Sequence, residues 1–115
     1  MAGLSHRLLA ATALVVLALL FGALNTSALA AGRGVAIRDT SFSPATITIK
    51  VGDRITWTNR GSVPHNVTFD SFASTTYMDP GTTFAHTFKT AGTFVYQCTL
   101  HSFAGKVVVT TAATP

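Results

Sequence analysis

Hydrophobic and polar residues alternate along much of the chain after residue 31, in short runs separated by turn residues. In "ATITIKVGD", Ile47, Ile49 and Val51 alternate with polar residues, and a period of two places alternate side chains on opposite faces of a β-strand. Similar strand-like runs are "VAIRD", "RITWTN", "PHNVTF", "TFAHTF", "TFVYQC" and "KVVVT". Turn residues separate these runs, and none has a long helical period. The pattern predicts an all-β domain, an antiparallel β-sandwich or barrel.

Two of these runs, "TFAHTF" and "TFVYQC", are joined by Lys89–Gly92 and are predicted to form a β-hairpin. With the turn centred in that segment, Cys98 would lie opposite Thr83, at the end of the sandwich away from the turn. His86 would then lie two or three residue pairs further along the hairpin. We therefore interpret His86 as a partly buried structural histidine.

The N-terminal segment has a different composition. A short basic start precedes an apolar run from Leu8 to Leu24, and Ala28–Ala30 forms a small-x-small site of the kind that signal peptidase cuts. This pattern predicts a signal peptide at 1–30 and one domain at 31–115, exported to a periplasm or the cell exterior. The alternative is an uncleaved anchor at the cell surface, because about seventeen apolar residues is the lower limit for a membrane span.

The predicted mature chain is small and weakly basic. Seven Lys and Arg residues against four Asp leave a net charge of +3. The basic residues are scattered, which argues against a nucleic-acid partner. A domain of this size buries only about 60–65% of its unfolded surface, and a single cysteine cannot form an internal disulfide, so a bound metal is one remaining means of stabilisation. No pair of carboxylates indicates acid–base chemistry.

The single cysteine lies near two histidines in the predicted fold. His101 follows Cys98 by three residues in a loop, and His65 begins a strand directly after another loop. Two imidazoles and a thiolate suit copper first and zinc second. An unpaired thiol in an oxidising compartment is otherwise a liability, which metal ligation would explain. The alternative is a buried structural thiol that packs as a small hydrophobe.

At these residues the sequence resembles the cupredoxins, the blue copper proteins of the plastocyanin, amicyanin and pseudoazurin kind. The resemblance runs from about residue 35 to 110, and its most specific parts are "PHNV", "AGTFVYQCTLH" and "GKVVV". It implies a cupredoxin-like antiparallel Greek-key β-sandwich or barrel. It also implies one copper ion that alternates between Cu(I) and Cu(II), with His65, Cys98 and His101 as its ligands.

The resemblance implies roles for the neighbouring residues as well. Asn66 would tie the two ligand loops together and stabilise the thiolate. His101 would be the partly exposed electron port, and Phe103 and Ala104 would lie in an apolar rim for partner docking. The implied protein is a small exported type 1 (blue) copper protein, a monomer that carries single electrons between a donor and an acceptor protein.

Other functions remain as alternatives to electron transfer. The first is a copper-binding module for storage, delivery or resistance, and the second is a metal-free domain of the same fold. An enzyme is the weakest alternative, because it rests only on an open copper position that binds a small molecule. A multicopper oxidase is excluded, since such enzymes need many more histidines than this chain contains.

One departure from the family leaves the axial copper position open. In "HSFAGK" the loop is one residue shorter than in close relatives and lacks the usual axial methionine, and Ala104 cannot ligate a metal. The site could be three-coordinate, or the backbone carbonyl of Pro64 could be a weak fourth ligand. The Met78 thioether is the third alternative, although methionine more often fills a core. The fourth is an open position taken by water or a small ligand.

Overall fold

The computed structural model describes residues 30–74 and 77–111, and these residues form strands, turns and loops without a helix. The predicted signal peptide therefore lies almost wholly outside the described residues. Within the described part, no helix is long and apolar enough to cross a membrane. The strands are β1 (Gly32–Ile37), β2 (Phe42–Ser43), β3 (Thr46–Lys50), β4 (Arg54–Asn59), β5 (Thr68–Phe69), β6 (Thr83–Thr87), β7 (Gly92–Cys98) and β8 (Phe103–Thr110).

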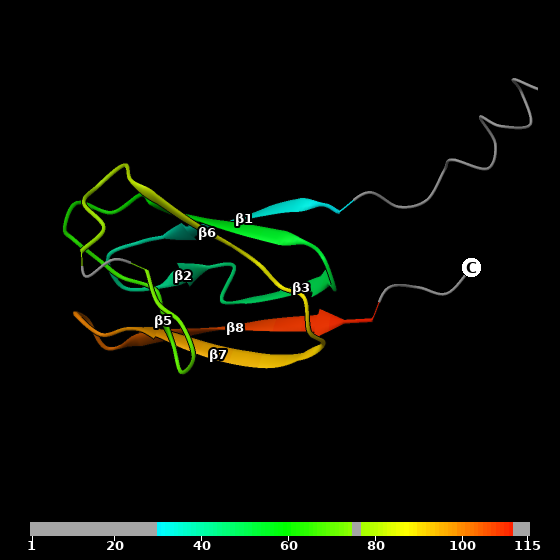
Figure 1. Ribbon diagram of the computed structural model, residues 1–115. Helices are drawn as coiled ribbons and strands as arrows, with labels where there is room; N and C mark the ends of the chain where they lie inside the picture. The colour runs from blue at the N-terminus through cyan, green and yellow to red at the C-terminus, as the bar shows by residue number, and fades with distance from the viewer. Residues whose placement is uncertain (1–29, 75–76, 112–115) are drawn as a thin grey trace, which may run out of the picture.

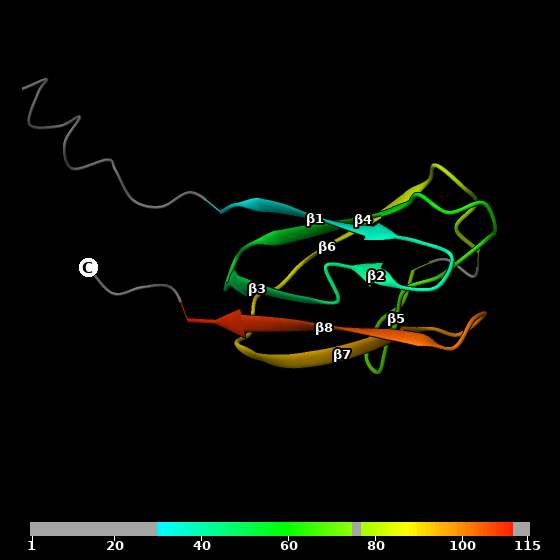
Figure 2. The same ribbon diagram turned by 180° about the vertical axis from the view of Figure 1, so that it is seen from behind.

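These strands form two facing four-stranded sheets, as Figures 1 and 2 show from opposite sides. One sheet has the order β2-β1-β4-β6, and the other has the order β3-β8-β7-β5. The predicted all-β sandwich is confirmed. The pairs β1–β4 and β3–β8 are parallel, so both sheets are mixed rather than purely antiparallel. Parallel neighbours need a crossover connection, and here the chain makes it by passing from one sheet to the other.

The predicted hairpin between β6 and β7 is wrong. Strand β6 pairs with β4, which places His86 opposite Ile55. Strand β7 pairs with β5 and β8, and Cys98 lies opposite Phe103. The segment between β6 and β7 instead crosses between the sheets, because Phe88 is buried in the core and its backbone N–H bonds to the carbonyl of Asp53.

The core lies between the two sheets and follows the alternation seen in the sequence. In β3, Ile47 and Ile49 are buried while the residues between and beside them are exposed. Trp57 of β4 is fully buried at the centre. Its indole contacts four aromatic rings, which come from both sheets and from the β6–β7 connection: Phe69, Phe84, Phe88 and Tyr96. Truncating such a residue typically costs about 3–5 kcal/mol, so this cluster holds β7, the strand that ends in Cys98, against the opposite sheet.

The connections β1–β2, β4–β5 and β7–β8 all lie at one end of the sandwich, opposite the end where the described chain begins and finishes (Figures 1 and 2). The chain therefore brings residues that are far apart in sequence to the same end. We call it the loop end, and it carries the candidate site.

Candidate metal centre

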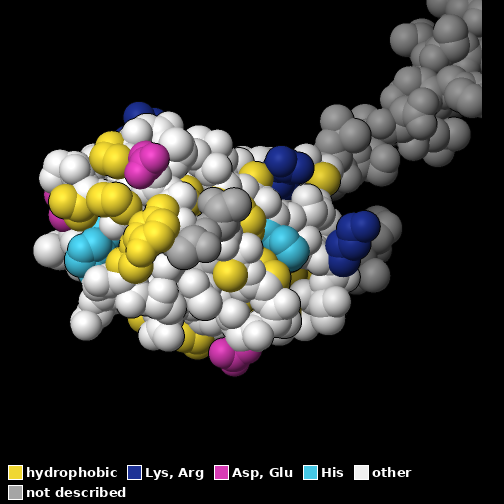
Figure 3. Space-filling model, turned by 60° about the vertical axis from the view of Figure 1, so that its left-hand side comes forward, with side chains coloured by type: hydrophobic (Ala, Val, Ile, Leu, Met, Phe, Trp, Pro, Cys, Tyr) yellow, Lys and Arg dark blue, Asp and Glu magenta, His cyan; other side chains and the backbone are white. Residues whose placement is uncertain are grey.

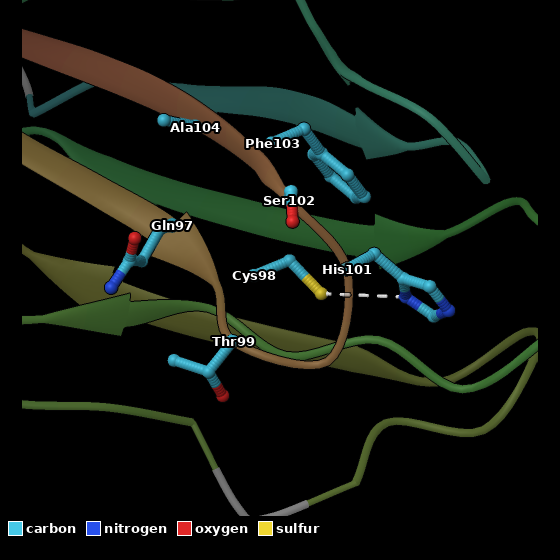
Figure 4. Close-up of a pocket in the computed structure, with 7 residues that line it drawn as sticks. All are labelled: Gln97, Cys98, Thr99, His101, Ser102, Phe103 and Ala104. Carbon is cyan, nitrogen blue, oxygen red and sulfur yellow. Dashed lines mark hydrogen bonds between the residues drawn. The ribbon is translucent and has the colours of Figure 1, made fainter.

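The structure brings His65, Cys98 and His101 together at the loop end. The Cys98 Sγ atom lies 3.6 Å from Nδ1 of His65 and 3.8 Å from Nδ1 of His101. The two Nδ1 atoms are 3.1 Å apart. Among the described residues, these three form the group of His, Cys and acidic side chains able to hold a metal ion. Figure 4 shows the sulfur of Cys98 and the ring of His101 pointing toward each other across the β7–β8 turn.

The β7–β8 connection places two of the three side chains. Cys98 is the last residue of β7, and it is buried because it shares a face of that strand with buried Tyr96. The chain then turns through residues 99–102 and re-enters the sheet at Phe103, whose N–H donates to the carbonyl of His101. His101 is exposed in this turn. One donor atom therefore comes from a fixed strand end and one from an exposed loop.

His65 is held from both its backbone and its ring. Its N–H and carbonyl pair with the carbonyl and N–H of Met78 in an isolated antiparallel bridge. Its side chain is 0% exposed, and Nε2 lies 3.1 Å from Oδ1 of Asp39. The imidazole is therefore buried with Nδ1 directed at the other two donor atoms and Nε2 directed at a carboxylate.

Asn66 connects the two ligand-bearing connections. Its amide Nδ2 donates to the Thr99 hydroxyl at 2.6 Å, and its Oδ1 accepts the Thr99 N–H at 2.9 Å and the Thr68 hydroxyl at 3.1 Å. Asn66 directly follows His65 and Thr99 directly follows Cys98. These bonds therefore fix the separation of the two buried ligand positions.

Asp39 lies against the site, although no sequence pattern indicates a role for it. It follows β1, and its Oδ1 and Oδ2 accept the N–H and the hydroxyl of Ser62 at 2.9 and 2.7 Å. Hydrogen bonds lower the pKa of Asp39 to about 2, and the bond from the Ser62 hydroxyl contributes more than the bond with His65. No spacing rule links it to His65, which is 26 residues away. The two residues come together because β1 pairs in parallel with β4, which sets Ile37 opposite Asn59. The sequence pattern does not reveal that pairing, so it does not reveal the contact.

The two candidates for the axial position both lie beside His65. Met78 is 2% exposed and belongs to the apolar core cluster. Because bridged residues on antiparallel chains present their side chains to the same side, Met78 shares a side with His65. Pro64 is exposed and immediately precedes His65. Asn59 holds this segment in place, since its Nδ2 donates to the carbonyls of Val63 and Met78.

The predicted docking residues lie next to the exposed histidine. Phe103 is half-buried, with its ring 5.4 Å from that of His65 and 6.4 Å from that of His101, and Ala104 is exposed. A shallow hollow of about 420 Å³ opens here, lined by Gln97, Cys98, Thr99, His101, Ser102, Phe103 and Ala104 (Figure 4). Figure 3 shows hydrophobic side chains gathered around a histidine at the end of the molecule far from the terminal grey trace.

His86 lies away from this cluster. Its ring stacks on Phe72 at 3.8 Å and meets Phe88 edge to face at 4.9 Å. Burial lowers the pKa of His86, which favours the neutral ring. The structure thus places it in an aromatic packing role on another part of the surface.

The donor set and its spacing fit a first-row transition metal. Nitrogen and sulfur ligands lie about 2.0–2.3 Å from such an ion, so three of them in one plane are separated by about 3.5–3.8 Å. The two sulfur–nitrogen distances of 3.6 and 3.8 Å fall in this range, and the nitrogen–nitrogen distance of 3.1 Å is slightly shorter. A planar set of two imidazoles and one thiolate is the arrangement of blue copper sites.

Comparisons with known proteins agree with this geometry. A sequence profile of the Cupredoxin-like domain matches residues 10–109. Amicyanin-alpha of Methylorubrum extorquens is 34% identical over 103 residues, which cover 73% of this chain and 87% of that protein. The chloroplastic plastocyanin of Tetradesmus obliquus is 40% identical over 78 residues, 57% of this chain. The chain covers only 54% of the length of that plastocyanin and 52% of the amicyanin of Paracoccus denitrificans.

Solved structures show the same fold. A purple cupredoxin from Nitrosopumilus maritimus superposes with a TM-score of 0.64 at 29% identity, covering 68% of this chain and 99% of that one. A Cu(I) form of an amicyanin mutant superposes with a TM-score of 0.62 at 36% identity, covering 73% and 86% of the two chains. With its two-sheet sandwich, its cluster of two histidines and a cysteine, and these relatives, the chain belongs to the cupredoxin-like family.

Proposed function

We propose that this chain is a small exported type 1 copper protein that binds one copper ion and carries single electrons between a donor and an acceptor protein. The observation that carries this proposal is the convergence of His65 Nδ1, His101 Nδ1 and Cys98 Sγ within 3.8 Å of one another. Bound copper would supply a one-electron Cu(I)/Cu(II) couple. The relatives that carry the names plastocyanin and amicyanin support the same role rather than that of an enzyme.

The residues around the donors suit an electron carrier. His65 and Cys98 are buried and fixed by strand pairing and by the Asn66–Thr99 bonds, so they can keep their positions when the charge of the metal changes. His101 is exposed beside Phe103 and Ala104. This gives the metal one exit to the surface through an imidazole bordered by two apolar side chains, and we expect a redox partner to dock there briefly.

The axial position is proposed to fall to the Met78 thioether or to the Pro64 backbone carbonyl. Both residues are adjacent to His65, Met78 through the backbone bridge and Pro64 along the chain. A long, weak axial contact of either kind is compatible with a blue copper site. Replacement of Met78 by leucine separates these two alternatives, because it removes the sulfur and leaves the carbonyl in place.

Export and processing form part of the proposal. The apolar segment before Ala28–Ala30 supports cleavage of residues 1–30, which would leave 31–115 as a monomeric domain in a periplasm or outside the cell. The scattered surface charges support protein partners rather than nucleic acid. Mass spectrometry of the exported protein tests this part, with Ala31 as the expected first residue.

The decisive experiment is the visible and EPR spectrum of the exported protein after one equivalent of Cu(II). We expect an intense thiolate-to-copper band and small copper hyperfine splitting, both lost in Cys98→Ser. Ser102→Ala is the matched control, since it removes a hydroxyl from the same turn without removing a donor. Colourless protein, or copper with ordinary tetragonal EPR that a chelator removes, would contradict the electron-transfer role.

A copper storage or delivery role is the second candidate, and the hollow beside Cys98 is the observation that favours it. Rapid transfer of Cu(I) to a chelator or acceptor, with no stable coloured Cu(II) form, would be the result expected for that role. Reversible one-electron cycling at a steady potential would argue for electron transfer instead.

A further inference from the structure

The carboxylate of Asp39 lies behind the imidazole of His65. Its side chain is 43% exposed, yet Oδ1 lies 3.1 Å from Nε2 of a histidine that is 0% exposed. The two residues come from different connections, β1–β2 and β4–β5. A partly exposed carboxylate therefore contacts an imidazole ring that is shielded from solvent.

The β4–β5 connection is shaped to receive this carboxylate. The N–H and the hydroxyl of Ser62 donate one hydrogen bond to each of its oxygens. At the preceding position, a Cβ on Gly61 would overlap Oδ1 of Asp39 and lie 3.0 Å from Nε2 of His65. Gly61 is in turn held by Asn59, whose Oδ1 accepts the Gly61 N–H at 2.9 Å. The close approach thus depends on glycine at 61 and on a paired hydroxyl at 62.

We propose that Asp39 is a positioning residue of the metal centre, whose carboxylate accepts the Nε2–H of His65 and keeps Nδ1 free to bind the metal. The copper part of this inference rests on the function proposed above. A carboxylate can only accept a hydrogen bond from the ring, so the ring proton is placed on Nε2. Nδ1 then presents its lone pair toward Cys98 Sγ and His101 Nδ1.

The negative charge of Asp39 should also affect metal affinity and the reduction potential of the site. Carboxylates behind metal-bound histidines raise ligand basicity, and their loss typically weakens metal binding by about 10–100-fold. A fixed negative charge near the metal stabilises Cu(II) more than Cu(I). Removal of the charge should therefore weaken Cu(II) binding more than Cu(I) binding and raise the reduction potential. Each tenfold difference between the two losses corresponds to about 59 mV for a one-electron couple.

The variants Asp39→Asn and Asp39→Ala separate charge from geometry. Asparagine can keep the shape, because its Oδ1 can accept from His65 and Ser62 while its amide donates to the Ser62 hydroxyl. It loses only the charge. Alanine loses both the charge and the acceptor. Asp70→Asn is the matched control, since it removes the same charge from an exposed residue outside this cluster.

The first measurement uses the metal-free exported protein near pH 8 and reads the ring nitrogens of His65 by proton–nitrogen NMR. We expect the Nε2–H tautomer in the wild type and in Asp39→Asn, and a mixture of tautomers in Asp39→Ala. A wild-type ring with its proton on Nδ1 would overturn the proposal. This readout needs no copper, so it tests Asp39 even if the proposed copper function fails.

The second measurement compares Cu(II) affinity and reduction potential. We expect Asp39→Asn to lose about 10–100-fold in Cu(II) affinity with a raised potential, and Asp70→Asn to match the wild type. Gly61→Ala tests the contact in a second way, because it displaces the Asp39 carboxylate without removing it. Its copper affinity and potential should resemble those of Asp39→Ala. Equal affinity and potential in Asp39→Asn and Asp70→Asn would refute a charge effect on the metal.

Discussion

Gly105 provides a strong test of how the core supports the site, because two simple arguments predict opposite signs for Gly105→Ala. Gly105 lies in β8 directly opposite Tyr96 of β7, and it is buried. Replacing a strand-interior glycine by alanine normally stabilises a protein by about 0.5–1 kcal/mol, since glycine loses more backbone freedom on folding. The local packing predicts a loss instead.

The magnitude follows from the atoms that the new methyl group would meet. A Cβ at Gly105 would lie 2.5 Å from Oη and 2.8 Å from Cε1 of Tyr96, whereas non-bonded carbon atoms prefer about 3.5–4.0 Å. The Tyr96 ring cannot easily move away, because it is 1% exposed and packs against the rings of Phe42 and Trp57 at 4.5 and 5.5 Å. Overpacking of this kind costs about 1–3 kcal/mol, which lowers the Tm of a domain this small by about 4–24 °C.

The assay is thermal and denaturant unfolding of the metal-free protein, with Gly34→Ala as the matched control. Gly34 also lies in a strand, but a Cβ there meets only the Thr56 carbonyl, at 3.9 Å, so that variant should be neutral or slightly stabilised. In a Tyr96→Leu background the cost of Gly105→Ala should largely disappear. A neutral or stabilising Gly105→Ala in the wild-type background would refute the packing argument.

Three further predictions concern the site and the dependence of stability on pH. Met78→Leu should leave the copper band and the reduction potential unchanged, since Met78 lies in the core cluster, and it should lower the free energy of unfolding by less than about 1.5 kcal/mol. A shifted band would show instead that the Met78 sulfur contacts the metal. Hydrogen bonds from the N–H groups of Lys50 and Ala31 lower the pKa of Asp53 below its ordinary 3.8. These bonds therefore stabilise the fold fully above about pH 4, and the stabilisation is lost as the pH falls through the folded-state pKa. In acid, the stability of Asp53→Asn should depend less steeply on pH than that of the wild type. Burial raises the pKa of Tyr96 from 10.0 to about 12. The wild type should therefore lose about 2 kcal/mol of stability between pH 10 and 12, and unfolding of Tyr96→Phe over that range should not show this loss.

A period-two pattern determines which face of a strand is buried. It correctly placed Ile47 and Ile49 of β3 on the buried face, because the side of a strand depends only on local alternation. It did not determine which strands pair. The β6–β7 hairpin was wrong because Phe88 enters the core and its backbone bonds to the β3–β4 turn, and these are contacts between distant segments that no local pattern encodes.

In the candidate site, too, residue type could be read from the sequence, whereas spatial position depended on strand pairing. His65, Cys98 and His101 were selected by residue type and by resemblance, and the structure places them together. Asp39 carried no such signal, since an aspartate after a strand is ordinary in a turn. Its position depends on the parallel register of β1 on β4, a non-local pairing that sets the ends of both strands side by side.

This arrangement explains how a domain with a single cysteine, and so without an internal disulfide, can hold the candidate metal ligands in place. His65 is fixed by the bridge to Met78 and by Asp39, and Cys98 is fixed by β7, while the Asn66–Thr99 bonds set the distance between them. All of these contacts join protein groups to one another, so they limit the movement of the two buried donors. His101 is exposed in its turn, so under the proposed function it is the ligand through which electrons would pass to a partner.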